Sequence, residues 1–69
     1  MERASVTSSS IVSVGYDAAQ AILEVEFCNG SIYQYSDVTL DQHRALMGAE
    51  SKGTHFNLHV RDRHPYRRV

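Results

Sequence analysis

The sequence predicts an α+β fold in which a three-stranded antiparallel β-meander packs against one or two short α-helices. Three observations support this class: apolar and acidic residues alternate between residues 21 and 27, Asn29-Gly30 is a strong hairpin signal, and a helix-capping pattern begins at Thr39. The strands are expected at 10–16, 21–27 and 31–36, and the helices near 39–48 and 51–62. Sixty-nine residues allow a single domain, 1–69, with 1–8 as a flexible lead-in.

The hairpin between the second and third strands has two candidate registers. A two-residue Asn29-Gly30 loop pairs Phe27 with Ile32, and it places Tyr33 and Tyr35 on the face that carries the acidic residues. A slip of one residue moves every side chain of a strand to the other face. The register therefore decides whether the tyrosines are core residues or an exposed stacking platform.

The second register uses a three-residue loop, 28–30, with its glycine in the left-handed conformation. It pairs Val25 with Tyr33 and Leu23 with Tyr35, so that the apolar residues of both strands share one face. We favour this register because it satisfies the burial pattern. The two tyrosines are then mainly packing residues whose hydroxyls reach the margin of the sheet.

The helical half begins with a capping box at 39–42, in which the Thr39 hydroxyl and the Gln42 side chain satisfy each other's backbone N–H groups. This helix is expected to end near Gly48 and to bury Leu40 and Met47, with Leu46 as a further candidate. Ser51 is the second cap, for a helix that presents Phe56 and Val60 on one face. Pro65 ends helical structure, and residues 66–69 form either a short strand or a basic tail.

The cellular setting follows from what the composition lacks. Cys28 is the single cysteine, so no intramolecular disulfide can form, and reducing conditions are expected. No apolar run approaches the roughly 20 residues of a membrane span. We expect a cytoplasmic chain without membrane contact, and its oligomeric state stays open.

Acidic and basic residues are segregated along the chain, although the net charge is only −1. Residues 1–51 carry seven acidic and two basic side chains, whereas residues 52–69 carry one acidic and five basic side chains. Such a basic segment is typical of a surface for nucleic acid or for an acidic protein. The alternative is that the basic end pairs with the acidic sheet of the same molecule.

An ordered set of short motifs resembles the KTSC domain, a family named for its occurrence at the C-terminus of some lysyl-tRNA synthetases and also found as a free-standing small bacterial or phage protein. The motifs are Ser8-Ser9-Ser10-Ile11, Val14-Gly15-Tyr16-Asp17, Leu23-Glu24-Val25-Glu26-Phe27, Asn29-Gly30, Tyr33-x-Tyr35, Ala49-x-Ser51-x-Gly53, Phe56-Asn57, Arg61-Asp62-Arg63 and Pro65-Tyr66-Arg67-Arg68-Val69. No single motif is specific, but their order over nearly the whole chain is. The resemblance implies a small α+β module without an established activity, for which the synthetase context suggests RNA binding.

The sequence departs from the family pattern at four positions. Thr39 lies where a proline is expected, and His43, His55 and His64 lie where the family commonly has tyrosine. A histidine is a weaker and pH-dependent substitute for tyrosine in stacking. Any role that depends on aromatic stacking at these three positions is therefore in question.

The basic end is the strongest candidate for a binding site. The expected nucleic-acid-binding residues are Lys52, His55, His59, Arg61, Arg63, Arg67 and Arg68. Four of them recur at spacings of three and four, as on one side of a helix: Lys52, His55, His59 and Arg63. A solvated helix face has the same spacing. Arginine side chains bind phosphate with two parallel hydrogen bonds, and phosphate contacts supply most sequence-independent affinity.

Catalysis and metal binding have little support in the sequence. His55 and His59 have the i, i+4 spacing of two helical zinc ligands, but a structural site needs about four ligands. Cys28 at a predicted turn has no visible activating group. We expect no enzyme, no catalytic residue, no metal and no cofactor.

Two classes of function follow. The first is a non-catalytic module that binds RNA or another nucleic acid through the basic end. The alternative is a protein-interaction module, or a small regulator that docks on a larger complex such as the translation or transcription machinery. Tyr66 is either a plug that closes the core or an exposed ring for a base, and we favour the plug.

Overall fold

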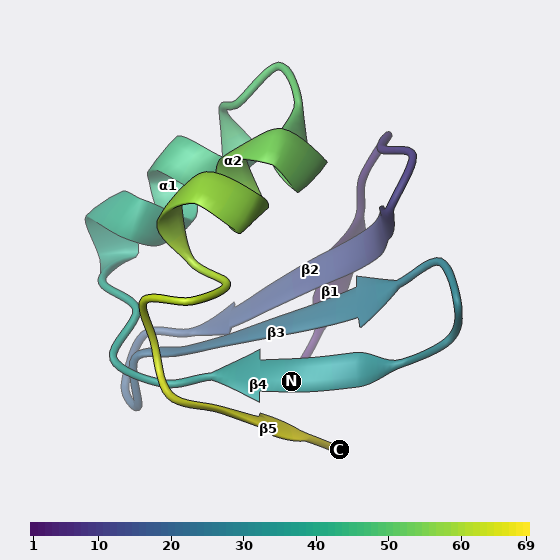
Figure 1. The fold of residues 1–69 in the computed structure, drawn as a ribbon. Coiled ribbons are helices and arrows are strands. Elements are labelled where there is room, and N and C mark those ends of the chain that lie inside the picture. The colour runs from purple at the N-terminus through teal and green to yellow at the C-terminus, as the bar shows by residue number, and fades with distance from the viewer.

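The computed structural model describes residues 1–69, and it is an α+β domain built on one antiparallel sheet (Figure 1). The strands are β1 (Arg3–Ser5), β2 (Ile11–Asp17), β3 (Ile22–Phe27), β4 (Ile32–Tyr35) and β5 (Tyr66–Arg68), and the helices are α1 (Leu40–Met47) and α2 (Lys52–His59). The sheet has five strands in the order β1-β2-β3-β4-β5. Both helices lie between β4 and β5 in the chain and cover the same face of the sheet (Figure 1).

The three predicted strands are the central strands of this sheet, and the favoured register is confirmed. Val25 pairs with Tyr33 and Leu23 pairs with Tyr35. Gly30 has a φ of 88°, and the N–H of Phe27 donates to the carbonyl of Ser31 at 2.9 Å. The loop therefore has the three residues and the left-handed glycine expected of a bulged turn.

The prediction of only three strands was wrong, because β1 and β5 extend the sheet at its two edges. Residues 1–8 contain β1 in place of the expected flexible lead-in, and Arg3 pairs with Gly15. Residues 66–68 form a strand, not a tail, and Tyr66 pairs with Tyr35. Each edge strand has three residues, all exposed, so neither has the apolar alternation by which a strand is recognised.

The two helices begin where their caps were predicted. Thr39 and Gln42 form the complete capping box, and the Ser51 side chain accepts from the N–H of Thr54. Leu46 is buried, whereas Leu40 is 44% exposed, so the expectation that Leu40 packs in the core was wrong. Neither helix is long and apolar enough to cross a membrane.

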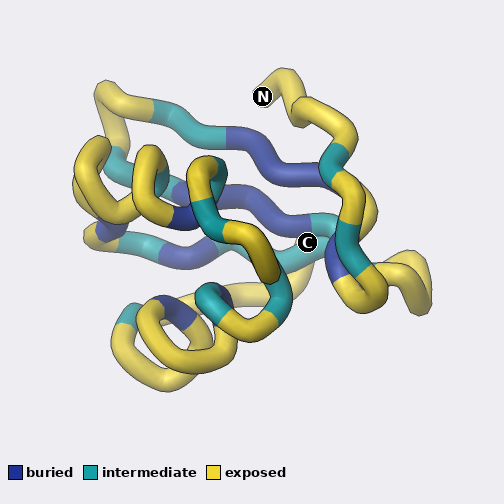
Figure 2. The backbone as a smooth tube through the Cα atoms, turned by 90° about the horizontal axis from the view of Figure 1, so that it is seen from above, coloured by how far each residue is buried: buried dark blue, intermediate teal, exposed yellow.

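The core lies between the sheet and the helices. It consists of Ile11, Val14, Leu23, Val25, Tyr35, Val38, Leu46, Phe56 and Val60. In Figure 2, burial is concentrated in the central strands, whereas the turns and the outer sides of the helices are exposed. An irregularity in β2 between Ile11 and Ser13 brings Ile11 onto the same buried face as Val14.

Candidate functional site

A groove lies between α2, the β3–β4 hairpin and the segment that leads from α2 into β5. Its volume is about 630 Å³, and its aromatic lining consists of Phe27, Tyr33, Tyr35, Phe56 and Tyr66. Its polar lining includes Ser9, Ser10, Asn57, Arg61 and Asp62. A volume of several hundred Å³ that combines aromatic rings with polar and charged groups can hold a ligand.

The tyrosine rings form one continuous cluster. The ring centroid of Tyr66 lies 5.8 Å from that of Tyr33 and 5.5 Å from that of Tyr35. Tyr35 is 4% exposed and packs edge to face against Phe56 at 5.1 Å. Tyr66 is 62% exposed, so it covers one side of Tyr35 but leaves most of its own surface to solvent. The plug hypothesis is therefore right about its position and wrong about its burial.

The strand pairing explains why these rings meet. Tyr33 and Tyr35 are two residues apart on β4 and share the face that the helices cover. Strand β5 then places Tyr66 opposite Tyr35 and Arg68 opposite Tyr33. The cluster thus gains a third ring and a guanidinium group from a segment more than 30 residues away in the chain.

The groove depends on a close approach between the N-terminal loop and α2. An added Cβ atom at Gly53 would lie 2.5 Å from the hydroxyl oxygen of Ser10. Any larger residue at position 53 would require the Ser10 side chain to move away from the helix. Gly53 therefore maintains this wall of the groove.

The pKa of Tyr35 depends on its burial and on two charged residues of the groove. Burial raises the pKa of Tyr35, and the positive charge of Arg61 opposes the rise, whereas the negative charge of Asp62 adds to it. The hydroxyls of Tyr33, Tyr35 and Tyr66 accept or donate no hydrogen bond within the chain, although the hydroxyl of Tyr16 donates to the carbonyl of Val38 at 2.6 Å. Three hydroxyl groups of the groove are thus free to bind a ligand.

The structure does not bring the seven predicted nucleic-acid-binding residues into one patch. Arg61 lines the groove, and Arg68 shares the face of Tyr33. Arg67 lies on the opposite face of the sheet, where its guanidinium donates to Gln34 Oε1 at 3.0 and 3.2 Å. Consecutive residues of a strand point to opposite faces, which is why Arg67 and Arg68 separate.

The remaining four residues lie on α2 and just beyond it. Lys52 Nζ donates to the carbonyl of Ala49 at 3.2 Å, and Arg63 Nε donates to the carbonyl of Leu58 at 3.1 Å. The rings of His55 and His59 lie 4.5 Å apart on α2. Burial lowers the pKa of His55, and the neighbouring His59 lowers it further.

The face of the sheet that the helices leave uncovered carries a polar network. Glu24, which is only 7% exposed, accepts from Arg3 Nη1 and, at 2.9 Å, from Gln34 Nε2. Ser13 donates to Glu26 at 2.9 Å. Both ion pairs of the molecule involve Arg3, so the basic segment 52–69 forms no ion pair with the acidic sheet.

Two of the histidines in question have defined contacts. The ring of His43 stacks on Tyr16 at 4.6 Å with an interplanar angle of 9°, and burial lowers the pKa of His43. His64 Nδ1 lies 3.1 Å from the carbonyl oxygen of Ser36. His43 does stack on an aromatic ring, but on one that belongs to the domain itself.

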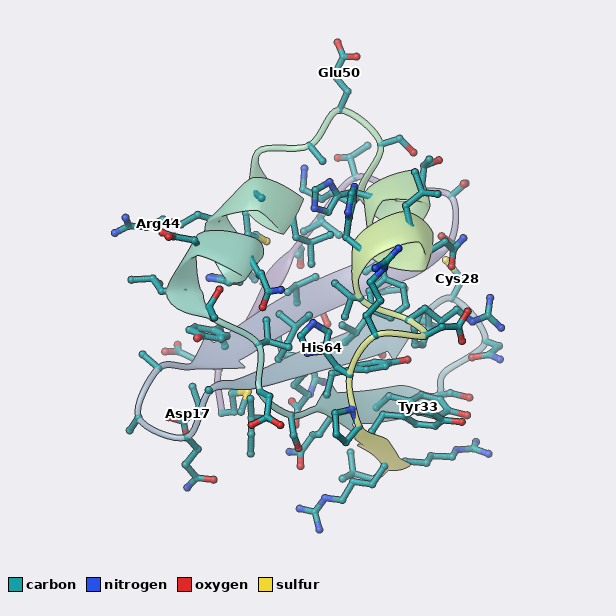
Figure 3. The ribbon with its side chains drawn as sticks, turned by 60° about the vertical axis from the view of Figure 1, so that its left-hand side comes forward. Asp17, Cys28, Tyr33, Arg44, Glu50 and His64 are labelled. Atoms are coloured by element: carbon teal, nitrogen blue, oxygen red, sulfur yellow. The ribbon has the colours of Figure 1, made fainter.

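The possible metal ligands and the single cysteine do not form a reactive cluster. No three His, Cys, Asp or Glu side chains come close enough to hold a metal ion. Cys28 is exposed at the rim of the groove, and its thiol lies 3.4 Å from the carbonyl oxygen of Ser9. Figure 3 shows Cys28 and Tyr33 on one side of the molecule and Arg44 on the opposite side.

Sequence reasoning missed several residues of this groove. No role in a site was expected for Ser9, Ser10, Asn57 and Asp62, which were seen only as parts of family motifs and, for Ser10, as the start of a strand. Phe27 and Tyr33 were expected to be packing residues, and both also line the groove. No local pattern marks these positions, because they converge only when β5 and the N-terminal loop dock.

The fold and the groove define a class of small α+β domains, in which a five-stranded antiparallel meander carries two helices on one face. The family model of the KTSC domain matches residues 7–66, so the chain belongs to the KTSC domain family. The crystal structure of a KTSC domain protein from Yersinia pestis has a TM-score of 0.96 and 35% identity, covering 99% of this chain and 96% of that one.

Two further proteins are similar in sequence. An uncharacterized protein of Stutzerimonas stutzeri (strain A1501) is 45% identical over 64 residues, which is 93% of this chain and 90% of the relative. A protein of Tsukamurella paurometabola is 40% identical over 58 residues, which is 84% of this chain and 87% of the relative. The resemblance inferred from the motifs is therefore confirmed.

Proposed function

We propose that the domain is a non-catalytic binding module for single-stranded RNA or another single-stranded nucleic acid, and that the strand lies in the aromatic groove. One observation carries the proposal: the Tyr66 ring is 62% exposed and lies beside Tyr33, with Arg61 in the groove and Arg68 opposite Tyr33. Exposed rings next to guanidinium groups are the elements with which proteins bind single strands.

Stacking supplies the part of the affinity that does not depend on salt. A base can lie on the free side of Tyr66, because the other side already packs against Tyr35. Base stacking on an aromatic ring contributes about 1–3 kcal/mol per base. The packed side also holds the ring in place, so less conformational entropy is lost when a base binds.

The arginines supply the part that depends on salt. Arg61 and Arg68 are exposed, and neither forms an ion pair within the chain. Their guanidinium groups can therefore donate to phosphate or base acceptors without first losing a partner. Arg67 is different, because it already donates to Gln34 on the opposite face.

This difference between neighbouring arginines provides a matched test by fluorescence anisotropy with a labelled single-stranded RNA. Arg68→Ala should weaken binding and make the slope of log K against log[salt] shallower by about 0.7, the value for one phosphate of a single strand. Arg67→Ala removes the same charge from the opposite face and should leave the slope unchanged. Tyr66→Ala should lower the affinity about 5- to 150-fold with the slope intact.

Cys28 provides an independent readout, because its thiol is exposed at the rim of the groove. Bound RNA should slow the alkylation of Cys28 by N-ethylmaleimide.

Equal losses of RNA affinity in Arg67→Ala and Arg68→Ala would contradict a site on this face. No saturable binding at low salt would reject the proposal and favour the protein-interaction alternative.

A further inference from the structure

The segment that leaves α2 places a cation and an anion side by side in the groove. Arg61 and Asp62 both line it, and neither forms an ion pair with any residue of the chain. The backbone here is held by two hydrogen bonds, from the N–H of Arg61 to the carbonyl of Phe56 at 3.0 Å and from the N–H of Arg63 to the carbonyl of Val60 at 3.1 Å. These hydrogen bonds fix the backbone from which the side chains of Arg61 and Asp62 extend.

Asp62 is unexpected in a site for a polyanion. It is the single acidic residue among the residues that line the groove, and it forms no ion pair within the chain. A carboxylate beside a phosphate path lowers phosphate affinity, because like charges repel. The same carboxylate is favourable where a ligand presents hydrogen-bond donors, since an ionised aspartate only accepts.

Both charged groups line the same groove as the tyrosine cluster. The positive charge of Arg61 lowers the pKa of Tyr35, and the negative charge of Asp62 raises it. Tyr66 packs on Tyr35 and exposes its other side. A flat ring stacked on Tyr66 would lie in the same groove as an acceptor, Asp62, and a forked donor, Arg61.

We propose that the groove recognises a guanine base, which stacks on Tyr66 while Asp62 accepts from the guanine N1–H and N2–H groups and Arg61 donates to its O6 and N7 atoms. The inference rests on the proposed function and adds the identity of the base. Guanine presents N1–H and the N2 amino group side by side, which matches the two oxygens of a carboxylate. Arginine paired with O6 and N7 is the commonest specific contact to this base.

The other bases fit this pair less well. Adenine and cytosine each present one amino group next to a ring-nitrogen acceptor, which would face a carboxylate oxygen. Uracil presents one N–H between two carbonyl groups. Each therefore leaves part of Asp62 unpaired or repelled, and a site with unpaired polar groups rejects such a ligand.

The test compares two RNA pentamers, 5′-UUGUU-3′ and 5′-UUAUU-3′, and two nucleotides, GMP and AMP, by amide chemical-shift titration of the whole chain. The G-containing pentamer should bind about tenfold more tightly than the A-containing one. In Asp62→Asn, which keeps the shape but adds a donor, the preference should fall below about twofold. Glu50→Gln makes the same change of charge at the tip of the loop between the helices, far from Tyr33 in Figure 3, and should retain it.

A second variant tests Arg61 without removing its charge. Arg61→Lys keeps the cation but loses the fork, so it should reduce the preference for the G-containing pentamer. Arg44→Lys, on the opposite side of the molecule, is its control. Thermal unfolding of each variant shows whether the domain remains folded.

The outcomes separate the two proposals. Equal affinity for both pentamers, with strong salt dependence, would overturn guanine recognition and leave single-strand binding intact. Saturable binding of GMP but of neither pentamer would support the guanine site with a free nucleotide as its ligand, and would reject RNA binding. No saturable shift with any of the four probes would overturn both.

Discussion

The charge of Glu24 depends on its neighbours in the fold. The hydrogen bond from Gln34 and the contact with Arg3 lower its pKa, although burial acts in the opposite direction. Gly15 makes the Arg3 contact possible, because an added Cβ atom there would lie 2.9 Å from Arg3 Cγ. The carboxylate therefore links β1 to β3 and β4 on the face away from the helices.

We predict that Glu24 contributes to stability in a pH-dependent way. A carboxyl whose pKa is lower in the folded state stabilises the fold above its unfolded pKa, near 4.5, and this contribution is lost as the pH falls through the folded value. Glu24→Gln should reduce the free energy of unfolding by about 1–3 kcal/mol near neutral pH. Urea titrations at several pH values should also show a smaller acid-induced loss in the variant. Glu50→Gln is the exposed control, and identical acid losses in Glu24→Gln and the parent protein would contradict the prediction.

At the scale of elements, each helix has eight residues and depends on its cap and its packing. The two caps differ in completeness. In α1, the N–H of Gln42 donates to Thr39 Oγ1 at 3.1 Å, and the N–H of Thr39 donates to Gln42 Oε1 at 2.8 Å. In α2, the N–H of Thr54 donates to the Ser51 hydroxyl at 3.4 Å, and no side chain returns a bond to the Ser51 N–H.

We predict that the two caps differ in their contribution to stability. Thr39→Ala removes the hydroxyl that accepts from the N–H of Gln42 and leaves only the backbone half of the box. It should lower the free energy of unfolding by about 1–2 kcal/mol. Ser51→Ala removes one long bond from a backbone N–H and an exposed hydroxyl–hydroxyl bond to Thr54. It should cost less, about 0.5 kcal/mol. Thermal unfolding followed by circular dichroism measures both. A larger loss in Ser51→Ala than in Thr39→Ala would show that the packing of α2, and not the cap geometry, governs these ends.

At the scale of the whole molecule, stability is expected to be highest in the middle of the sheet. Five of the nine core residues belong to β2, β3 and β4, whereas every residue of β1 and β5 is exposed. Amides open locally where few apolar contacts hold the backbone. Hydrogen exchange followed by NMR should therefore show slow exchange in β3 and fast exchange in β1 and β5. Equal protection of β5 and β3 would mean that the docking of β5 is stronger than its exposure suggests.

Interactions between residues close in the chain determine the central strands, the hairpin turn and the helix starts. The sequence by itself was enough to predict these elements. The alternation over residues 22–27, the left-handed Gly30 and the box at Thr39 each involve residues close in the chain, so turn geometry and side-chain periodicity specify them. Local signals of this kind were enough to predict the register of the central hairpin and the starts of both helices.

Only the tertiary structure decided the edges of the sheet and the groove. The strands β1 and β5 have three exposed residues each, and their pairing with Gly15 and Tyr35 comes from distant segments, so no periodic signal announces them. That pairing turns Arg68 toward the tyrosines and Arg67 away. A charge pattern in the sequence indicates that a segment is basic, but the face on which each arginine lies depends on the register of a strand, which is set by docking.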